Sequence, residues 1–128
     1  MKKSILLFSI LFLAFTVSGC SKIRQNFRAR LDLYRAEQTF WKAEQLKHHK
    51  VSFEQRKPIY DEACTLYIQA YDQASGIFNA GKLEEARNSC FNAERFEWVK
   101  KLEEISSAYC AEHPKECEYG FMQGGVSI

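Results

Sequence analysis

The chain has 128 residues, of which 46% are hydrophobic, and five cysteines accompany a formal net charge of only +2. A chain of this length supports one small domain rather than several. All 16 acidic residues follow residue 20, and 16 bases match them once Lys2 and Lys3 are set aside. This balance argues against strong attraction to nucleic acid, so no nucleic-acid partner is expected.

The first 20 residues have the three-part layout of a secretory signal peptide. Lys2 and Lys3 supply a positive start, residues 5–17 are apolar apart from two hydroxyl residues, and small residues then lead into Cys20. The apolar run is shorter than the roughly 20 residues that a spanning helix needs. It therefore suits a signal better than a membrane span.

The motif Val17-Ser18-Gly19-Cys20 resembles the lipobox of bacterial lipoproteins, although leucine is commoner in that family where Val17 stands. The resemblance implies removal of residues 1–19 and acylation of Cys20 on its sulfur and its new amino group. Such acyl chains would anchor the domain in a lipid bilayer. In Gram-negative members an aspartate after the cysteine favours the inner membrane, so Ser21 implies the outer membrane, with the domain facing the periplasm. The alternatives are an ordinary signal peptide cut elsewhere and an uncleaved anchor.

A basic segment follows directly after Cys20. Across residues 22–35 it contains one acid, Asp32, and the cations Lys22, Arg24, Arg28, Arg30 and Arg35. Each cation near an anionic lipid surface contributes on the order of 1 kcal/mol to binding. The segment is therefore a candidate for contact with lipid headgroups, and the alternative is an ordinary solvated helix face.

Apolar residues after Cys20 recur at intervals of three and four, which is the helical period, so the predicted fold class is all-α. Three helices are expected, over residues 22–48, 53–80 and 82–112. Ser52 and Gln55 form a candidate capping box for the second helix, Gly81 is the expected stop before the third, and Pro114 ends the third. These helices make up a domain over residues 20–117, and residues 118–128 are expected to be a flexible tail.

One pattern of large and small residues recurs in all three helices, as Leu33-Ala36-Phe40-Ala43, Tyr60-Ala63-Tyr67-Ala70 and Leu83-Ala86-Cys90-Ala93. Alternating size along one stripe lets facing helices interlock. The pattern is similar to the second helix of a tetratricopeptide repeat, and Gly81 stands where that family places a glycine. The copies start 27 and 23 residues apart, whereas that family repeats about every 34 residues, and its Trp-x-x-Leu-Gly opening is missing. We therefore expect an antiparallel three-helix bundle with tetratricopeptide-like packing.

Four cysteines follow Cys20, in a compartment that permits disulfides. Cys90 and Cys110 share one predicted helix and lie about 30 Å apart along it, so they cannot bond. The chain beyond that helix is also too short to carry Cys117 back to Cys90. Pro114 turns the chain between Cys110 and Cys117, and these two cysteines are expected to form a disulfide.

Cys64 and Cys90 are predicted to be packed thiols near the core. If the second and third helices meet around Gly81, Cys64 lies opposite Trp98 instead of Cys90. The resulting mismatch of about 12 Å exceeds the roughly 6 Å that a disulfide allows. A second disulfide would require the second helix to end at about Gln73.

The expected bundle returns the end of the third helix to the first turn, beside His48 and His49. Cys110, His113 and Cys117 would then approach this pair and form a candidate site for zinc or copper. The disulfide competes for both thiols. The favoured interpretation is a solvated histidine pair, with no bound metal or cofactor.

No serine elbow, phosphate loop or metalloprotease helix motif is present, and three thin helices offer little concavity, so no enzyme activity is expected. The sequence holds more aromatic residues than a three-helix core can bury, and Trp41, Phe91 and Trp98 are the candidate partner-binding residues. The favoured function is a membrane-anchored adaptor or assembly protein that binds a protein partner in the cell envelope. The alternative is an envelope lipoprotein that responds to metal or redox state through its Cys110–Cys117 end.

Overall fold

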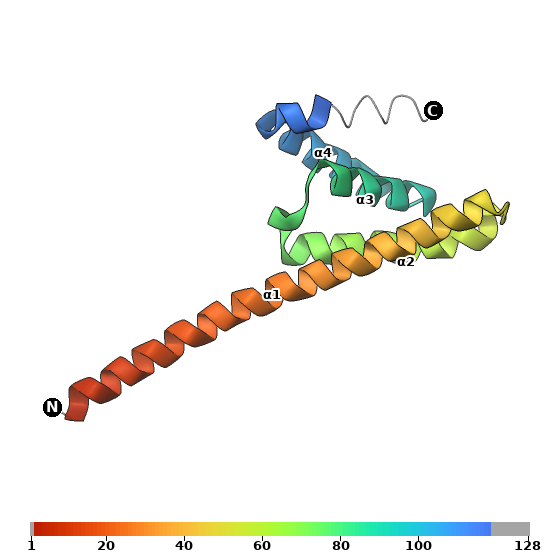
Figure 1. Ribbon diagram of the computed structural model, residues 1–128. Coiled ribbons are helices and arrows are strands. Elements are labelled where there is room, and N and C mark those ends of the chain that lie inside the picture. The colour runs from red at the N-terminus through yellow and green to blue at the C-terminus, as the bar shows by residue number, and fades with distance from the viewer. Residues whose placement is uncertain (1, 119–128) are drawn as a thin grey trace.

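The computed structural model describes residues 2–118, with side chains from Ser21 onward, and every regular element in this part is helical. In chain order the elements are α1 (Lys2–His48), α2 (Phe53–Gln73), the short 3-10 helix η1 (Ser75–Ile77), α3 (Ala80–Asn92) and α4 (Phe96–Glu112). Figure 1 shows α1 as one long helix that α2 crosses, with α3 and α4 on one side of it. The all-α prediction is confirmed, but the described part of the chain has four α-helices where three were expected.

α1 and α2 form an antiparallel hairpin. α1 begins at Lys2, well before the predicted range, and ends at His48. Lys50 then takes a left-handed φ of 61°, which reverses the chain. α2 begins after Ser52, whose hydroxyl accepts a hydrogen bond from the N–H of Gln55 in the predicted cap.

α2 ends at Gln73, short of the predicted boundary at residue 80. Ala74 adopts an extended φ of −156°, and the chain makes the η1 turn instead of further turns of α2. Phe78 supplies the physical reason, because its ring is buried and meets the ring of Tyr71 edge-on at a centroid distance of 5.4 Å. A continued helix would carry Phe78 past this contact.

α3 begins at a polar cap and not at the predicted glycine. The side chain of Asn79 accepts a hydrogen bond from the N–H of Lys82 at 2.9 Å. Gly81, predicted to separate the two helices, lies within the first turn of α3. An asparagine cap satisfies a free N–H group at the helix start, so it sets this boundary.

The single helix predicted over residues 82–112 is wrong, because the structure divides it into α3 and α4. Between them Glu94 has a left-handed φ of 60°, and the N–H of Arg95 bonds back into the last turn of α3 at 2.9 Å. This is a common way to end a helix. The chain then reverses, and α4 runs antiparallel to α3, with an ion pair of 2.9 Å between Arg87 and Glu103.

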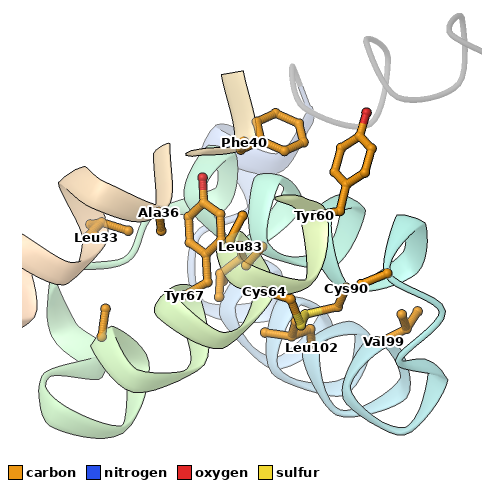
Figure 2. Close-up of a cluster of buried hydrophobic side chains, with 14 of the residues drawn as sticks. Leu33, Ala36, Phe40, Tyr60, Cys64, Tyr67, Leu83, Cys90, Val99 and Leu102 are labelled. Atoms are coloured by element: carbon orange, nitrogen blue, oxygen red, sulfur yellow. A yellow bond between two sulfur atoms is a disulfide. The ribbon is translucent and has the colours of Figure 1, made fainter. Parts of the chain in front are cut away.

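The core consists mainly of the three predicted stripes. All twelve stripe residues are buried, and the α2 stripe lies between the stripes of α1 and α3 (Figure 2). The alanines are 0% exposed except Ala93, so neighbouring backbones approach closely at these positions. Val99 and Leu102 extend the core into α4.

Two stripe tyrosines carry hydroxyl groups into the core, and both are satisfied. Tyr60 donates a hydrogen bond to Glu44 of α1 at 2.8 Å, and Tyr67 donates one to Glu85 of α3 at 2.9 Å. Burial, assisted by the Glu44 acceptor, raises the pKa of Tyr60 to about 12. Burial raises the pKa of Tyr67 further still, and Glu85 acts in the same direction. These two bonds tie α2 to the helices on either side of it.

α4 ends at Glu112, just before Pro114, and residues 114–118 form one more helical turn. Glu118, the first residue of the predicted tail, closes that turn. The rest of the predicted tail, residues 119–128, lies outside the described residues.

Candidate interaction surface

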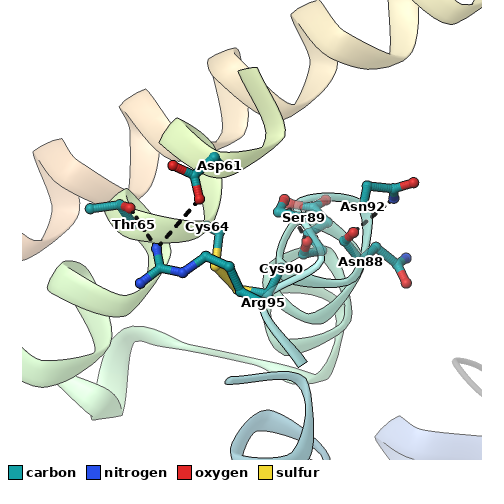
Figure 3. Close-up of a disulfide and its surroundings, with 9 residues drawn as sticks. Asp61, Cys64, Thr65, Asn88, Ser89, Cys90, Asn92 and Arg95 are labelled. Carbon is teal, nitrogen blue, oxygen red and sulfur yellow. Dashed lines mark hydrogen bonds and ion pairs between the residues drawn. A yellow bond between two sulfur atoms is a disulfide. The ribbon is translucent and has the colours of Figure 1, made fainter. Parts of the chain in front are cut away.

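A disulfide that the sequence prediction rejected joins α2 to α3. Cys64 and Cys90 are bonded at 2.06 Å, with their Cα atoms 4.8 Å apart and both side chains fully buried (Figures 2 and 3). The prediction of two packed thiols is therefore wrong. Its error lies in the turn, because residues 74–79 connect the helices around Ile77, midway between the two cysteines, and not around Gly81. The end of α2 at Gln73 is the one that a second disulfide was expected to require.

Polar contacts also hold the α3–α4 turn against α2 (Figure 3). The guanidinium of Arg95 donates a hydrogen bond to the hydroxyl of Thr65 at 2.9 Å and lies 3.7 Å from the carboxylate of Asp61. The neighbouring Glu94 pairs with Lys57 at 2.6 Å, and this hydrogen bond raises the pKa of Lys57. Together with the adjacent disulfide, these contacts fix the position of the turn.

Two phenylalanines flank the fixed turn and are exposed to solvent. Phe91 is 52% exposed and Phe96 is 58% exposed, and their rings meet edge-on with centroids 5.9 Å apart. Phe91 belongs to the predicted partner-binding set, whereas Phe96 does not. On one continuous helix the two rings would have pointed about 140° apart, so only the unexpected turn brings them together.

The other two predicted binding residues have different surroundings. Trp41 is 53% exposed on α1, and its ring lies edge-on to that of Phe40 at 5.5 Å. Trp98 is only half-buried, packs against the core, and has the ammonium of Lys101 4.7 Å from its ring centroid. The structure therefore does not gather Trp98 with the exposed pair at the turn.

The second disulfide, between Cys110 and Cys117, has an S–S distance of 2.05 Å and is the pair expected from the sequence. It folds the end of the chain back toward α3, where Glu116 accepts hydrogen bonds from the hydroxyl of Tyr109 at 2.8 Å and the N–H of Ala80 at 3.1 Å. These two donors lower the pKa of Glu116. The hydrogen bond between Tyr109 and Glu116 also raises the pKa of Tyr109. This end of the molecule is therefore fastened to the start of α3.

The proposed approach of the cysteine end to His48 and His49 is wrong. Because the chain reverses at residues 93–95, the end of α4 returns to the start of α3. His48 lies at the end of α1, and Figure 1 shows these two places at opposite ends of the body. His113 instead stacks on Tyr109 at a centroid distance of 4.2 Å. Among the residues that the structure describes, no three His, Cys, Asp or Glu side chains are grouped as a metal site.

Among residues 21–118, whose side chains the structure describes, no helix combines the length and apolar character needed to cross a bilayer. Comparison of the chain with protein-family models, with curated proteins and with solved structures gives no match.

Proposed function

We propose that this protein is a bacterial lipoprotein, anchored through acylated Cys20, that serves as an adaptor for a protein partner in the cell envelope. The signal-like segment ending at Cys20 supports the anchor. The two disulfides support an exported location, since disulfides persist in oxidising compartments. Ser21 favours the outer membrane, with the folded body facing the periplasm.

The exposed pair Phe91 and Phe96 is the observation that carries the adaptor role. Aromatic side chains dominate the binding energy of many protein interfaces. Here the two rings stand on a turn held by the Cys64–Cys90 disulfide and by two ion pairs. A partner would therefore meet a surface that is already ordered, and less conformational entropy is lost on binding.

The helix arrangement supports tetratricopeptide-like packing as the finer description of the fold. Two antiparallel pairs, α1 with α2 and α3 with α4, follow one another along the chain. The alternating large and small stripes supply their contacts. Repeats of this kind commonly use their surfaces to bind other proteins.

A photoreactive amino acid placed at position 91, in whole cells, tests the adaptor role. We expect one envelope protein to be captured, and capture through position 91 to fall in the Phe96→Ala variant. Phe53→Ala is the matched control, because Phe53 is a partly exposed phenylalanine on α2. Capture of lipid and copies of this chain alone would contradict the proposal, as would equal losses in the two variants.

A further inference from the structure

The side of α1 turned away from the core is apolar, and we call it the outer face. It consists of Ile23, Phe27, Leu31, Tyr34 and Trp41, with exposed fractions of 42–70%. Steps of four, four, three and seven residues place these side chains on one side of a helix. The buried residues of α1 follow the opposite side, as Ala29, Leu33, Ala36, Phe40 and Ala43. The stripe of α2 packs against that core side, and α3 is joined to it by the Lys82–Glu37 ion pair.

The acids of α1 beyond residue 20 are turned toward the body and are engaged there. Asp32 accepts a hydrogen bond from Gln73 of α2 at 3.0 Å. Glu37 pairs with Lys82 of α3 at 2.7 Å. Glu44 accepts the hydroxyl of Tyr60, as described above. No acid therefore remains on the outer face within the described part of α1.

Five cations of the same helix are exposed instead of being engaged with the body. Arg24, Arg28, Arg30, Arg35 and Lys42 are all exposed, and among the described residues none of them takes part in an ion pair. At about 100° per residue, Arg24, Arg28 and Arg35 border one edge of the apolar stripe, and Arg30 borders the other. The exposed surface of α1 thus combines aromatic side chains with unpaired positive charge.

We infer that the outer face of α1 lies on an anionic lipid surface. A helix with aromatic residues on one side and flanking arginines binds in the interface between headgroups and acyl chains, and anionic lipids strengthen that binding. A second copy of this chain suits the face less well, because two such faces would bring their arginines together. The inference rests on the membrane location proposed above but not on acylation of Cys20.

This placement fixes the orientation of the whole body. With the outer face against lipid, α2 and α3 both pack on the opposite side of α1, and α4 is joined to the body through α3. Phe91 and Phe96 belong to α3 and α4 and not to the helix that contacts lipid. Trp41, a partner-binding candidate from the sequence, becomes a lipid contact.

Vesicle binding by the unacylated chain of residues 20–128, carrying Cys20→Ser, tests the inference. Among the side chains that the structure describes, every buried one lies within residues 29–117, as do both disulfides, so we expect this chain to keep the folded body, which circular dichroism checks. We expect it to bind vesicles containing phosphatidylglycerol and not vesicles of phosphatidylcholine alone. Absence of binding to the anionic vesicles would overturn the inference while leaving acylation of Cys20 untouched.

Matched charge variants locate the binding surface. Arg28→Gln with Arg35→Gln should weaken binding about 30-fold, which corresponds to about 1 kcal/mol for each cation. Lys100→Gln with Lys115→Gln removes the same charge from exposed positions on α4 and in the turn after it, and should change binding by less than about threefold, since charges away from the surface are screened. Equal losses in the two pairs would show attraction by net charge alone and contradict the proposal.

The apolar side chains are tested separately. In a Trp98→Phe background Trp41 is the single tryptophan of the chain, and we expect brominated acyl chains to quench its fluorescence on binding. Binding without quenching would contradict insertion of the outer face. If the lipid-free protein forms a dimer that Phe27→Ser with Tyr34→Ser abolishes, the face is a dimer interface and the lipid assignment is wrong.

Discussion

Removing the buried disulfide should destabilise the protein more than removing the one near the chain end. Cys64→Ala with Cys90→Ala opens a loop with a sequence separation of 26, for which the chain-entropy relation gives about 3.5 kcal/mol. Cys110→Ala with Cys117→Ala opens a separation of 7, which gives about 2.4 kcal/mol. The first pair also removes sulfur atoms that are fully buried between α2 and α3, and this adds a packing loss to the entropic difference.

Urea unfolding of the oxidised chain from residue 20, followed by circular dichroism, measures both variants against the parent protein. We expect the free energy of unfolding to fall by at least about 1 kcal/mol more for the Cys64/Cys90 variant than for the Cys110/Cys117 variant. Crosslinking through position 91 should weaken only in the Cys64/Cys90 variant, because that disulfide helps to fix the α3–α4 turn. Equal destabilisation by the two variants would refute the reasoning.

Three further outcomes are expected. The raised pKa values of Tyr60 and Tyr67 mean that the folded state favours their neutral form, so their contribution to stability is complete below the ordinary tyrosine pKa of about 10. The free energy of unfolding should therefore fall as the pH rises from about 10 toward 12, and both tyrosines should ionise late in an ultraviolet titration. Asn79→Ala should lower the free energy of unfolding by about 1 kcal/mol in urea titration through loss of the α3 cap, and a loss below about 0.3 kcal/mol would contradict that role. Ala36→Leu should cost about 1–3 kcal/mol in the same assay through overpacking of α1 against the body, while Gln45→Leu at an exposed position should be nearly neutral.

The parts of the fold that could be predicted are those that depend on residues close together in the sequence. The large and small stripes, such as Tyr60-Ala63-Tyr67-Ala70, show which side of each helix is buried, because a helix presents residues three and four apart on one face. The cap at Ser52 was also readable, since its hydroxyl acts on a neighbouring N–H group. Neither inference needs information from distant parts of the chain.

The turns after α2 and α3 could not be predicted, because tertiary contacts set them. Glu94 adopts a left-handed conformation, for which glycine is the usual residue, so the sequence contains no signal for this turn. The ion pair with Lys57 supports Glu94 in this position. The connection after α2 is set by burial of Phe78 instead of by Gly81. Moving its centre from residue 81 to residue 77 changes the register between α2 and α3 by about eight residues, or about 12 Å. This shift explains the missed Cys64–Cys90 disulfide.

One candidate surface was missed because of the turn after α3. Phe96 could not be joined to Phe91 without knowing that the chain reverses between them. The outer face of α1 carried a signal that was available, because Phe27, Tyr34 and Trp41 recur every seven residues, offset from the core stripe. A second apolar period on one helix predicts a second contact surface.

The mass of the mature amino-terminal peptide, measured on protein extracted from cell membranes, tests the proposed membrane anchor most directly. The account predicts a chain that begins at Cys20 and carries acyl chains on its sulfur and on its new amino group. A Cys20→Ser variant should then lose this modification and remain unprocessed. An unmodified Cys20 thiol in the mature protein, or a chain cut at another position, would contradict the account.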